Sequence, residues 1–419
     1  MVFETTLIIQ TYGYEDGFLP TEPGDIVYPY PRMNHDLVTA PQPRLYKAVV
    51  LENDYVALYI LPELGGRLYR WVDKITGRRL LYENPVIKPT QWGYRGWWLS
   101  AGGIEWAFPV EEHGLNEWRS WNYTVSQSGD TALITVSDTE DRTGMEVGMT
   151  ILLENDSPLV MFQPWIRNFT ADDHNVQYWM NAMLALNNNR ISHSTEFIIP
   201  TGQVMVHSTG DSRLPGEWEW MSWPEVNGIN LSNYNSWQGW LGFFVPEVSE
   251  GFTAVYDHEI EQGIVRIYNP GWPAGTKIFG PGTLPTYLWT DDSSSYIELW
   301  SGITPTFADE LTIAAGDKTN WAEYWYPVHD LGGVTAANDM GTLFLRPDKG
   351  LVHIGAMVTQ GTAQSLTLWQ NMTQVQAWTF SLLPGQTLRT EISLTSSDNL
   401  GLHMADSAGH TLVQWGKVP

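Results

Sequence analysis

Short segments with the side-chain alternation of β-strands recur along almost the whole of this 419-residue chain. The segment TALITVSD at 131–138 alternates apolar and polar residues, as a half-buried strand does. Between Val56 and Leu61 both faces are apolar, which is typical of a strand buried in a sandwich. Few stretches show the period of roughly 3.6 residues that a helix longer than two turns requires. The pattern therefore predicts an all-β protein.

The chain divides into two parts on composition. Strands are expected over residues 47–61, 67–73, 79–83, 121–127, 131–137 and 143–153, and again in later segments such as YIELWSG at 296–302. The segment HDLGGVTAANDMG, residues 329–341, is rich in small residues and glycine, as is typical of a flexible domain boundary. We predict a large β-domain over residues 1–335 and a small accessory β-sandwich over residues 341–419.

The charge balance excludes several classes of partner. The chain has 22 basic and 47 acidic residues, a formal net charge of −25, which opposes binding to nucleic acid or to an anionic membrane. Charged residues make up only 16% of the chain, whereas Trp (22) and Tyr (19) are plentiful and are available to line a binding surface. With no cysteine, disulfides, thiolate zinc sites and cysteine nucleophiles are excluded.

The first residues, MVFETTLIIQTYGYED, lack the basic segment and the long apolar run of a signal peptide. No segment approaches the roughly 18 apolar residues of a membrane span. We therefore expect a cytoplasmic protein; secretion of a chain trimmed before its first residue is the alternative.

The stretch from Leu58 to His113 has the composition of a sugar-binding cleft. A strand is broken by Gly65 and Gly66, and a run of ionisable groups interleaved with tryptophans follows. Indole rings stack on the apolar faces of pyranose rings while carboxylates and cations hydrogen-bond the hydroxyls. We expect this run to lie on loops that leave a rigid sheet.

Several blocks resemble an uncharacterised bacterial family related to galactose mutarotase, whose members often carry tetratricopeptide repeats. The blocks are TYGY at 11–14, VYPYP at 27–31, NPVIKP at 84–89, GGIEWAFP at 102–109, YDHE at 256–259 and AEYWYPV at 322–328. The resemblance covers about residues 5–338 and ends where β-like sequence replaces the helical repeats. It implies a mutarotase-like supersandwich of twisted antiparallel sheets, followed here by the small C-terminal β-sandwich.

The resemblance also implies roles for individual residues. The block YIELWSGITPTFADELTIAAGDKTNWAEYW at 296–325 is similar to the mutarotase block that carries the general base, and it places Glu298 there. HGLNEWRSWNY is similar to a second block and points to His113. Asp257 and His258 resemble a pair that binds sugar hydroxyls. In WMNAMLALN, Asn181 is kept but Ala182 stands where mutarotases have their acid histidine, which puts ordinary mutarotase chemistry in doubt.

Two carboxylates are candidates on their own chemistry. Glu298 lies in a strand otherwise apolar on both sides, so it is either paired with Arg67 or Lys88 or faces a cleft. Glu105 precedes Trp106, and desolvation beside an indole raises the pKa of a carboxyl as a general acid requires; the alternative is a turn-fixing role. Glycoside hydrolysis needs two such groups, about 5–5.5 Å apart for retention and roughly 6.5–9.5 Å apart for inversion.

The remaining candidates are expected to bind the substrate, except for His113, which is expected to transfer a proton. Adjacent acids raise the pKa of His113, which makes it a plausible proton donor. Arg95 is either a cation for a sugar or a structural counter-ion. About half of the tryptophans are expected to line the cleft. The predicted substrate-binding set is Asp257, His258, Arg95, Lys88, Asn181, Trp97, Trp98, Trp106, Trp237, Trp240 and Trp289.

We expect a glycoside hydrolase acting on an oligosaccharide, with Glu298, Glu105 and His113 as the catalytic residues. The first alternative is a sugar 1-epimerase in which Glu298 is the base and His113 the acid. The second is a non-catalytic sugar-binding protein. No cofactor or metal is expected, since the pair Asp291 and Asp292 lacks further spaced oxygen ligands for calcium. The sequence does not define the oligomeric state.

Overall fold

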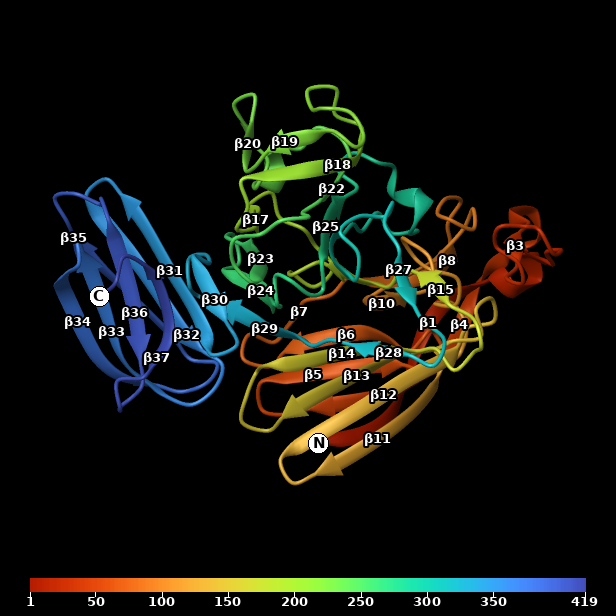
Figure 1. The fold of residues 1–419 in the computed structure, drawn as a ribbon, viewed down its shortest axis with the longest axis horizontal. Helices are drawn as coiled ribbons and strands as arrows, with labels where there is room; N and C mark the ends of the chain where they lie inside the picture. The colour runs from red at the N-terminus through yellow and green to blue at the C-terminus, as the bar shows by residue number, and fades with distance from the viewer.

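The computed structural model describes residues 1–419 and consists almost entirely of β-strands (Figure 1). The helical segments are four short 3₁₀ helices: η1 Tyr14–Gly17, η2 His35–Leu37, η3 Tyr234–Ser236 and η4 Thr286–Leu288. None of these helices has the length and apolar character needed to cross a lipid bilayer. The predicted all-β fold class is confirmed.

The largest sheet has 14 strands. Its strands are β1 Val2–Gly13, β4 Thr39–Glu52, β5 Val56–Leu61, β6 Arg67–Asp73, β7 Arg78–Arg79, β8 Glu83–Pro89, β9 Leu99–Gly102, β10 Ile104–Ala107, β16 Trp179–Leu184, β18 Gln203–Thr209, β19 Trp220–Ser222, β22 Leu241–Phe244, β25 Gly275–Gly280 and β26 Ile297–Gly302. Neighbouring strands run antiparallel except for the parallel pair of β1 and β8. The central order β22-β25-β26-β16-β10-β6 brings together strands that are far apart in the sequence.

A second sheet of nine strands packs against the first. Its strands are β11 Asn122–Ser128, β12 Thr131–Thr139, β13 Glu146–Glu154, β14 Val160–Arg167, β17 Thr195–Ile198, β23 Phe252–Asp257, β24 Gln262–Ile267, β28 Lys318–Asn320 and β29 Glu323–His329. The core between the two sheets is a cluster of 51 buried residues. Phe162 of the second sheet lies with its ring centroid 6.1 Å from that of Trp71 and 6.2 Å from that of Trp106, both in the first sheet. This is the predicted supersandwich.

Three separate two-stranded sheets accompany the two large sheets. They pair β2 Phe18–Leu19 with β3 Arg32–Met33, β15 His174–Val176 with β27 Leu311–Ile313, and β20 Glu225–Val226 with β21 Ile229–Asn230.

The end of the chain forms the predicted small β-sandwich, drawn in blue in Figure 1. One sheet contains β30 Ala336–Asn338, β31 Gly341–Asp348, β32 Leu351–Val358 and β35 Thr387–Ser393, and the other contains β33 Ala363–Gln370, β34 Thr373–Leu382, β36 Leu400–Ala405 and β37 Thr411–Gly416. The sandwich has a core of 16 buried residues of its own. Phe344 and Met357 also join a cluster with Tyr256 and Val328 of the nine-stranded sheet. The proposed domain limits of 1–335 and 341–419 stay a prediction.

Several predicted segments differ from the structure for local reasons. The run 47–61 is a hairpin and not one strand, because the Asn53 side chain accepts hydrogen bonds from the backbone N–H groups of Tyr55 and Val56, both at 2.8 Å, and turns the chain. The expected strand 79–83 is interrupted between β7 and β8. Glu105 lies within strand β10 and not on a loop.

A glycine pair allows β10 to join the sheet. Gly102 and Gly103 have φ angles of 80° and 78°, in the left-handed region that favours glycine. A Cβ at Gly103 would lie 2.4 Å from the carbonyl oxygen of Leu68 on the adjacent strand. The absence of side chains here lets β9 end and β10 begin in direct contact with β6, which places Glu105 in the sheet.

We predict that Gly103→Ala destabilises the protein by at least about 3 kcal/mol, because the new Cβ adds a backbone clash to the strain of a positive φ. Gly77→Ala is the matched control, since Gly77 has a φ of 71° but nothing within 4 Å of its Cβ position. It should cost about 1–2 kcal/mol. Urea unfolding measures both values, and equal losses would contradict the close approach.

Candidate functional site

The register of the 14-stranded sheet places two predicted site residues, Glu105 and Asn181, in one row with Trp300 and Lys277. Glu105 on β10 is paired with Asn181 on β16, Asn181 with Trp300 on β26, and Trp300 with Lys277 on β25. Glu298 lies two residues before Trp300 and therefore on the same face, because side chains alternate along a strand. The face opposite the inter-sheet core thus carries acidic, basic and indole groups.

This face forms a pocket of about 390 Å³, within the usual size range of small-molecule sites. Its charged lining residues are Glu112, His113, Lys277 and Glu298. Its aromatic lining residues are Trp92, Trp98, Trp240, Phe279, Trp289, Tyr296 and Trp300. The pocket combines proton-transfer groups with flat apolar surfaces, as a site for a sugar ring requires.

Glu298 is the one carboxylate in the floor of the pocket and is only 3% exposed. Its Oε2 accepts a hydrogen bond of 2.8 Å from the indole Nε1 of Trp300. Its Oε1 has only a contact of 3.5 Å with Nδ2 of Asn181. Burial raises the pKa of Glu298 above its ordinary value, although Lys277 and His113 act in the opposite direction. The group therefore has the raised basicity and the available oxygen atom of a general base.

His113 forms the facing wall and is held on two sides. Its ring stacks on Trp98 with centroids 3.8 Å apart and an interplanar angle of 8°. Its Nδ1 is in a short contact with Oε1 of Glu105, which leaves Nε2 for a ligand. Burial alone would lower the pKa of His113, but its interaction with Glu105 raises it above the ordinary value. The imidazolium form is favoured, as a proton donor near neutral pH requires.

Glu105 lies behind His113 and does not line the pocket. It is 1% exposed, and its Oε2 pairs with Arg67 at 3.1 Å while its Oε1 contacts His113. Burial opposes its ionisation, but His113 and Arg67 outweigh burial and hold the pKa of Glu105 below its ordinary value. The predicted role of Glu105 as a general acid is therefore corrected. The carboxylate is ionised, enclosed, and positions His113.

Asn181 connects Glu105, in its own row, to Glu298 in the adjacent row. Its Nδ2 lies 3.3 Å from Oε1 of Glu105 and 3.5 Å from Oε1 of Glu298. Ala182, the next residue, faces the core between the sheets with Ile104 and Leu299 as its strand partners. A histidine at position 182 would point away from the pocket, so the departure noted in the sequence does not affect the acid–base groups there.

Three of the nominated tryptophans line the pocket: Trp98, Trp240 and Trp289. The other three lie elsewhere. Trp106 is in the inter-sheet core, since it follows Glu105 and points to the opposite face. Trp237 is also in that core, and Trp97 packs in a separate cluster with Phe18. Side-chain alternation along β10 explains the position of Trp106. Trp97 and Trp237 are buried because tryptophan is more often part of a core than of a binding surface.

The nominated cations are used in structural ion pairs. Arg95 is 1% exposed and pairs with Glu117 at 2.6 Å, so it does not face a sugar. Lys88 pairs with Asp291 at 2.7 Å, outside the pocket. Neither Arg67 nor Lys88 pairs with Glu298, which removes the salt-bridge alternative for that carboxylate.

Asp257 and His258 lie on the nine-stranded sheet side, away from the pocket. Oδ1 of Asp257 accepts hydrogen bonds from the hydroxyls of Ser192 at 2.7 Å and Ser194 at 3.1 Å. His258 pairs with Glu196 at 2.7 Å. The structure therefore assigns this pair to holding a turn, and their predicted role in binding sugar hydroxyls is corrected.

Lys277, Glu112 and His207 line the pocket and were not selected from the sequence. The sequence does distinguish Lys277, because it is the single charged residue of the strand GTKIFG, as Glu298 is of YIELWSG. Glu112 has a φ of 56°, a strained conformation for this residue type. His207 lies two strands from Lys277, and no local pattern distinguishes it.

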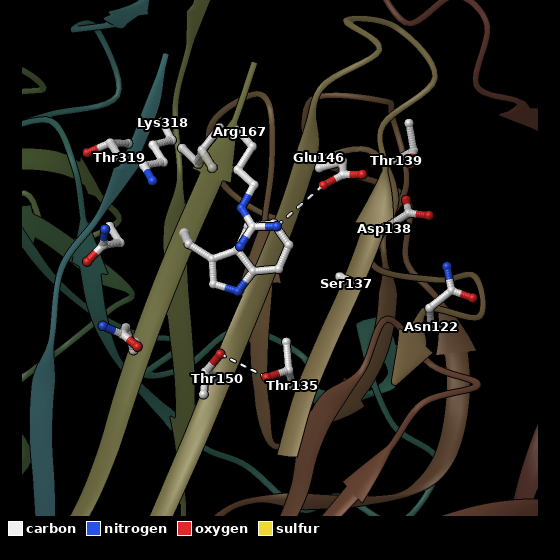
Figure 2. Close-up of a pocket in the computed structure, with 14 residues that line it drawn as sticks. Asn122, Thr135, Ser137, Asp138, Thr139, Glu146, Thr150, Arg167, Lys318 and Thr319 are labelled. Atoms are coloured by element: carbon white, nitrogen blue, oxygen red, sulfur yellow. Dashed lines mark hydrogen bonds and ion pairs between the residues drawn. The ribbon is translucent and has the colours of Figure 1, made fainter. Parts of the chain in front are cut away.

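A second hollow, of about 500 Å³, lies on the outer face of strands β12, β13 and β14 (Figure 2). Trp165 lies over Gly148, whose Cβ position would be 2.3 Å from the indole, and Arg167 covers the ring at 4.4 Å from its centroid. Arg167 is also 3.9 Å from Glu146. With its aromatic ring covered and no histidine among its lining residues, this hollow is a solvated polar sheet face.

The structure contains no group of three or more His, Asp or Glu side chains arranged to hold a metal ion. Asp292 accepts hydrogen bonds from Thr290 and Ser294 within its turn, and Asp291 pairs with Lys88 and accepts from Tyr12. These aspartates fix a loop.

The fold and the pocket define an all-β supersandwich protein with a pocket lined by acidic, basic and aromatic side chains on the face of its largest sheet. Residues 24–328 match the family described as Domain of unknown function (DUF5107), and the chain belongs to this family. This confirms the family resemblance inferred from the sequence blocks.

Solved structures are similar to this chain at low sequence identity, and two of them have TM-scores above 0.5. A TPR-domain containing protein from Parabacteroides distasonis has a TM-score of 0.70 and 24% identity over 83% of this chain, which covers 58% of that protein. The Slr1438 protein from Synechocystis has a TM-score of 0.51 and 14% identity over 68% of this chain and 96% of its own. A galactose mutarotase-like protein from Clostridium acetobutylicum has a TM-score of 0.47 and 10% identity over 68% of this chain and 96% of its own.

We predict that Glu105→Gln lowers the pKa of His113, because the negative charge that favours the imidazolium is removed while the shape is kept. NMR titration of the histidine resonances measures the change. Glu196→Gln is the matched control, since it removes the carboxylate partner of His258 and should leave the His113 titration unchanged. An unchanged pKa of His113 in Glu105→Gln would contradict the proposed positioning role.

Proposed function

We propose that this protein interconverts the anomers of a reducing sugar, with Glu298 as the general base and His113 as the general acid. The observation that carries the proposal is that these two groups line one pocket, each with one hydrogen-bonding atom held by the protein and the other available. Oε2 of Glu298 is held by Trp300 and Nδ1 of His113 by Glu105. Oε1 of Glu298 and Nε2 of His113 are the atoms left to face a ligand.

The reaction needs two proton transfers that occur together. Oε1 of Glu298 takes the proton of the anomeric hydroxyl, and the oxygen electrons form the aldehyde C=O bond as the bond between the anomeric carbon and the ring oxygen breaks. Nε2 of His113 gives its proton to the ring oxygen. After rotation of the aldehyde, the same steps in reverse close the ring on the other face, so no proton or electron is gained or lost.

The buried ion pair behind His113 supports its role as the acid. Arg67 and Asn181 hold Glu105 ionised and oriented, and Glu105 in turn fixes the ring of His113 against Trp98. A histidine held by a carboxylate on one nitrogen and free on the other is a recurrent way to orient an imidazole for proton transfer.

A glycoside hydrolase is the second candidate, because a second carboxylate, Glu112, also lines the pocket. In that case Glu112 and not Glu105 would act together with Glu298, since Glu105 is enclosed. Cleavage of nitrophenyl glycosides that is lost in Glu112→Gln would favour the hydrolase over the epimerase.

We predict that wild-type protein accelerates the change in optical rotation of a freshly dissolved aldose, and that Glu298→Gln or His113→Asn lowers the rate about 10²–10⁴-fold. Glu146→Gln, on the outer face of the other sheet, is the control and should keep the wild-type rate. A wild-type protein with no effect on any aldose, or a fully active Glu298→Gln, would contradict the proposal.

The pH dependence should be bell-shaped. Activity requires ionised Glu298 and protonated His113, so it rises as Glu298 loses its proton and falls as His113 loses its own. Because both pKa values are raised, the acidic limb should lie above the ordinary glutamate value of 4.5 and the alkaline limb above the ordinary histidine value of 6.5. Rates measured from pH 4 to 10 test this, and an alkaline limb below the ordinary histidine value would contradict the assignment of His113.

A further inference from the structure

Lys277 is the exception among the buried lysine and arginine side chains of this protein. The other three are each paired with a carboxylate: Arg67 with Glu105 at 3.1 Å, Arg95 with Glu117 at 2.6 Å, and Arg266 with Glu323 at 2.6 Å. Lys277 is 3% exposed, lines the pocket, and has no hydrogen-bond partner and no carboxylate within 4.0 Å. Nζ of Lys277 is not among the fully enclosed unpaired atoms, so its acceptor comes from the pocket: water in the free protein, and a ligand when one is bound.

Aromatic rings surround the protein side of this ammonium. Its Nζ lies 4.3 Å from the ring centroid of Trp300, 5.0 Å from that of Phe307 and 5.3 Å from that of Phe279. Such contacts partly offset the loss of water around a cation, but they supply no hydrogen-bond acceptor for its three N–H groups. The open direction for those N–H groups is the pocket.

Lys277 and Glu298 can both reach one ligand. Lys277 is paired with Trp300, whereas Glu298 is paired with Phe279, so the two residues lie in adjacent rows of the same face. Both contact the indole of Trp300: Glu298 accepts a hydrogen bond of 2.8 Å from its Nε1, and Nζ of Lys277 lies 4.3 Å from its ring centroid. A sugar bound over Trp300 can therefore have its anomeric hydroxyl at Glu298 and another substituent at Lys277.

From this geometry we propose that Lys277 binds an anionic substituent of the sugar ring, so that the substrate is an acidic sugar carrying a carboxylate or a phosphate. The assignment rests on the proposed function for the orientation of the ring. An anion matches the ammonium in both charge and acceptor capacity, whereas a neutral hydroxyl supplies only an acceptor, and Glu298 and Glu112 act on Lys277 only from beyond 4.0 Å.

The neighbouring groups leave Lys277 as the single cation at this end of the pocket. Burial lowers the pKa of His207 to about 3, so this lining residue is neutral at physiological pH. Burial also lowers the pKa of Lys277, while Glu298 and Glu112 act in the opposite direction without contacting it. A bound anion would add to that opposing effect and favour the charged ammonium.

The test compares matched sugars with wild-type protein and Lys277→Met. Anomer interconversion is followed by NMR for galactose, galacturonate, glucose, glucuronate and glucose 6-phosphate, the last separating phosphate from carboxylate. Wild-type kcat/KM should be at least tenfold higher for one class of acidic sugar than for its neutral counterpart. Lys277→Met should reduce this ratio at least tenfold, chiefly through KM. Lys318→Met, a lysine on the outer face of the other sheet, is the control and should keep the ratio.

Intrinsic tryptophan fluorescence provides a readout that does not depend on turnover, because Trp300 lies beside the ammonium. An acidic sugar that changes the fluorescence of wild type but not of Lys277→Met or Lys277→Gln, without any interconversion, would support the anion site and reject the epimerase. Turnover that favours neutral sugars, or a ratio unchanged in a Lys277→Met protein that unfolds at the wild-type temperature, would overturn the anion site alone.

Discussion

The buried contact between Glu105 and His113 is the interaction on which the site depends. This contact requires a buried carboxylate in the middle of the largest sheet. Arg67 offsets the cost of burying Glu105 by pairing with its second oxygen at 3.1 Å. A buried charge without such partners would be neutralised or exposed. Because Glu105 is held in strand β10, the histidine it contacts is held as well, and the ring of His113 is clamped against Trp98.

Neighbouring side chains on the same face connect this ion pair to Glu298, the proposed base. Asn181 lies between Glu105 and Glu298, and Trp300 donates to Glu298 from the same strand. Strand pairing alone brings these groups together from positions nearly two hundred residues apart. Glu105, Asn181 and Glu298 are therefore fixed by strands, whereas His113 lies on the loop after β10 and is fixed by its contacts with Glu105 and Trp98.

Local patterns predicted much of the fold and part of the site. Strand β6 was predicted over residues 67–73, as observed, and a lone carboxylate in an apolar strand, together with the family resemblance, selected Glu298. The sequence could not show that Glu105 lies behind His113, because that contact depends on how the loop after β10 folds back over the sheet. Arg95 was nominated for a sugar although its partner is Glu117, since both residues lie on loops whose course no local pattern defines. Local patterns identify the charged residues, and only the tertiary structure shows which of them pair.

The most direct test of this account is a crystal structure of the protein with a bound reducing sugar. The account predicts the anomeric hydroxyl within hydrogen-bonding distance of Oε1 of Glu298 and the ring oxygen within that distance of Nε2 of His113. A sugar bound in this pocket with neither oxygen near these two atoms, or bound only elsewhere on the molecule, would contradict it.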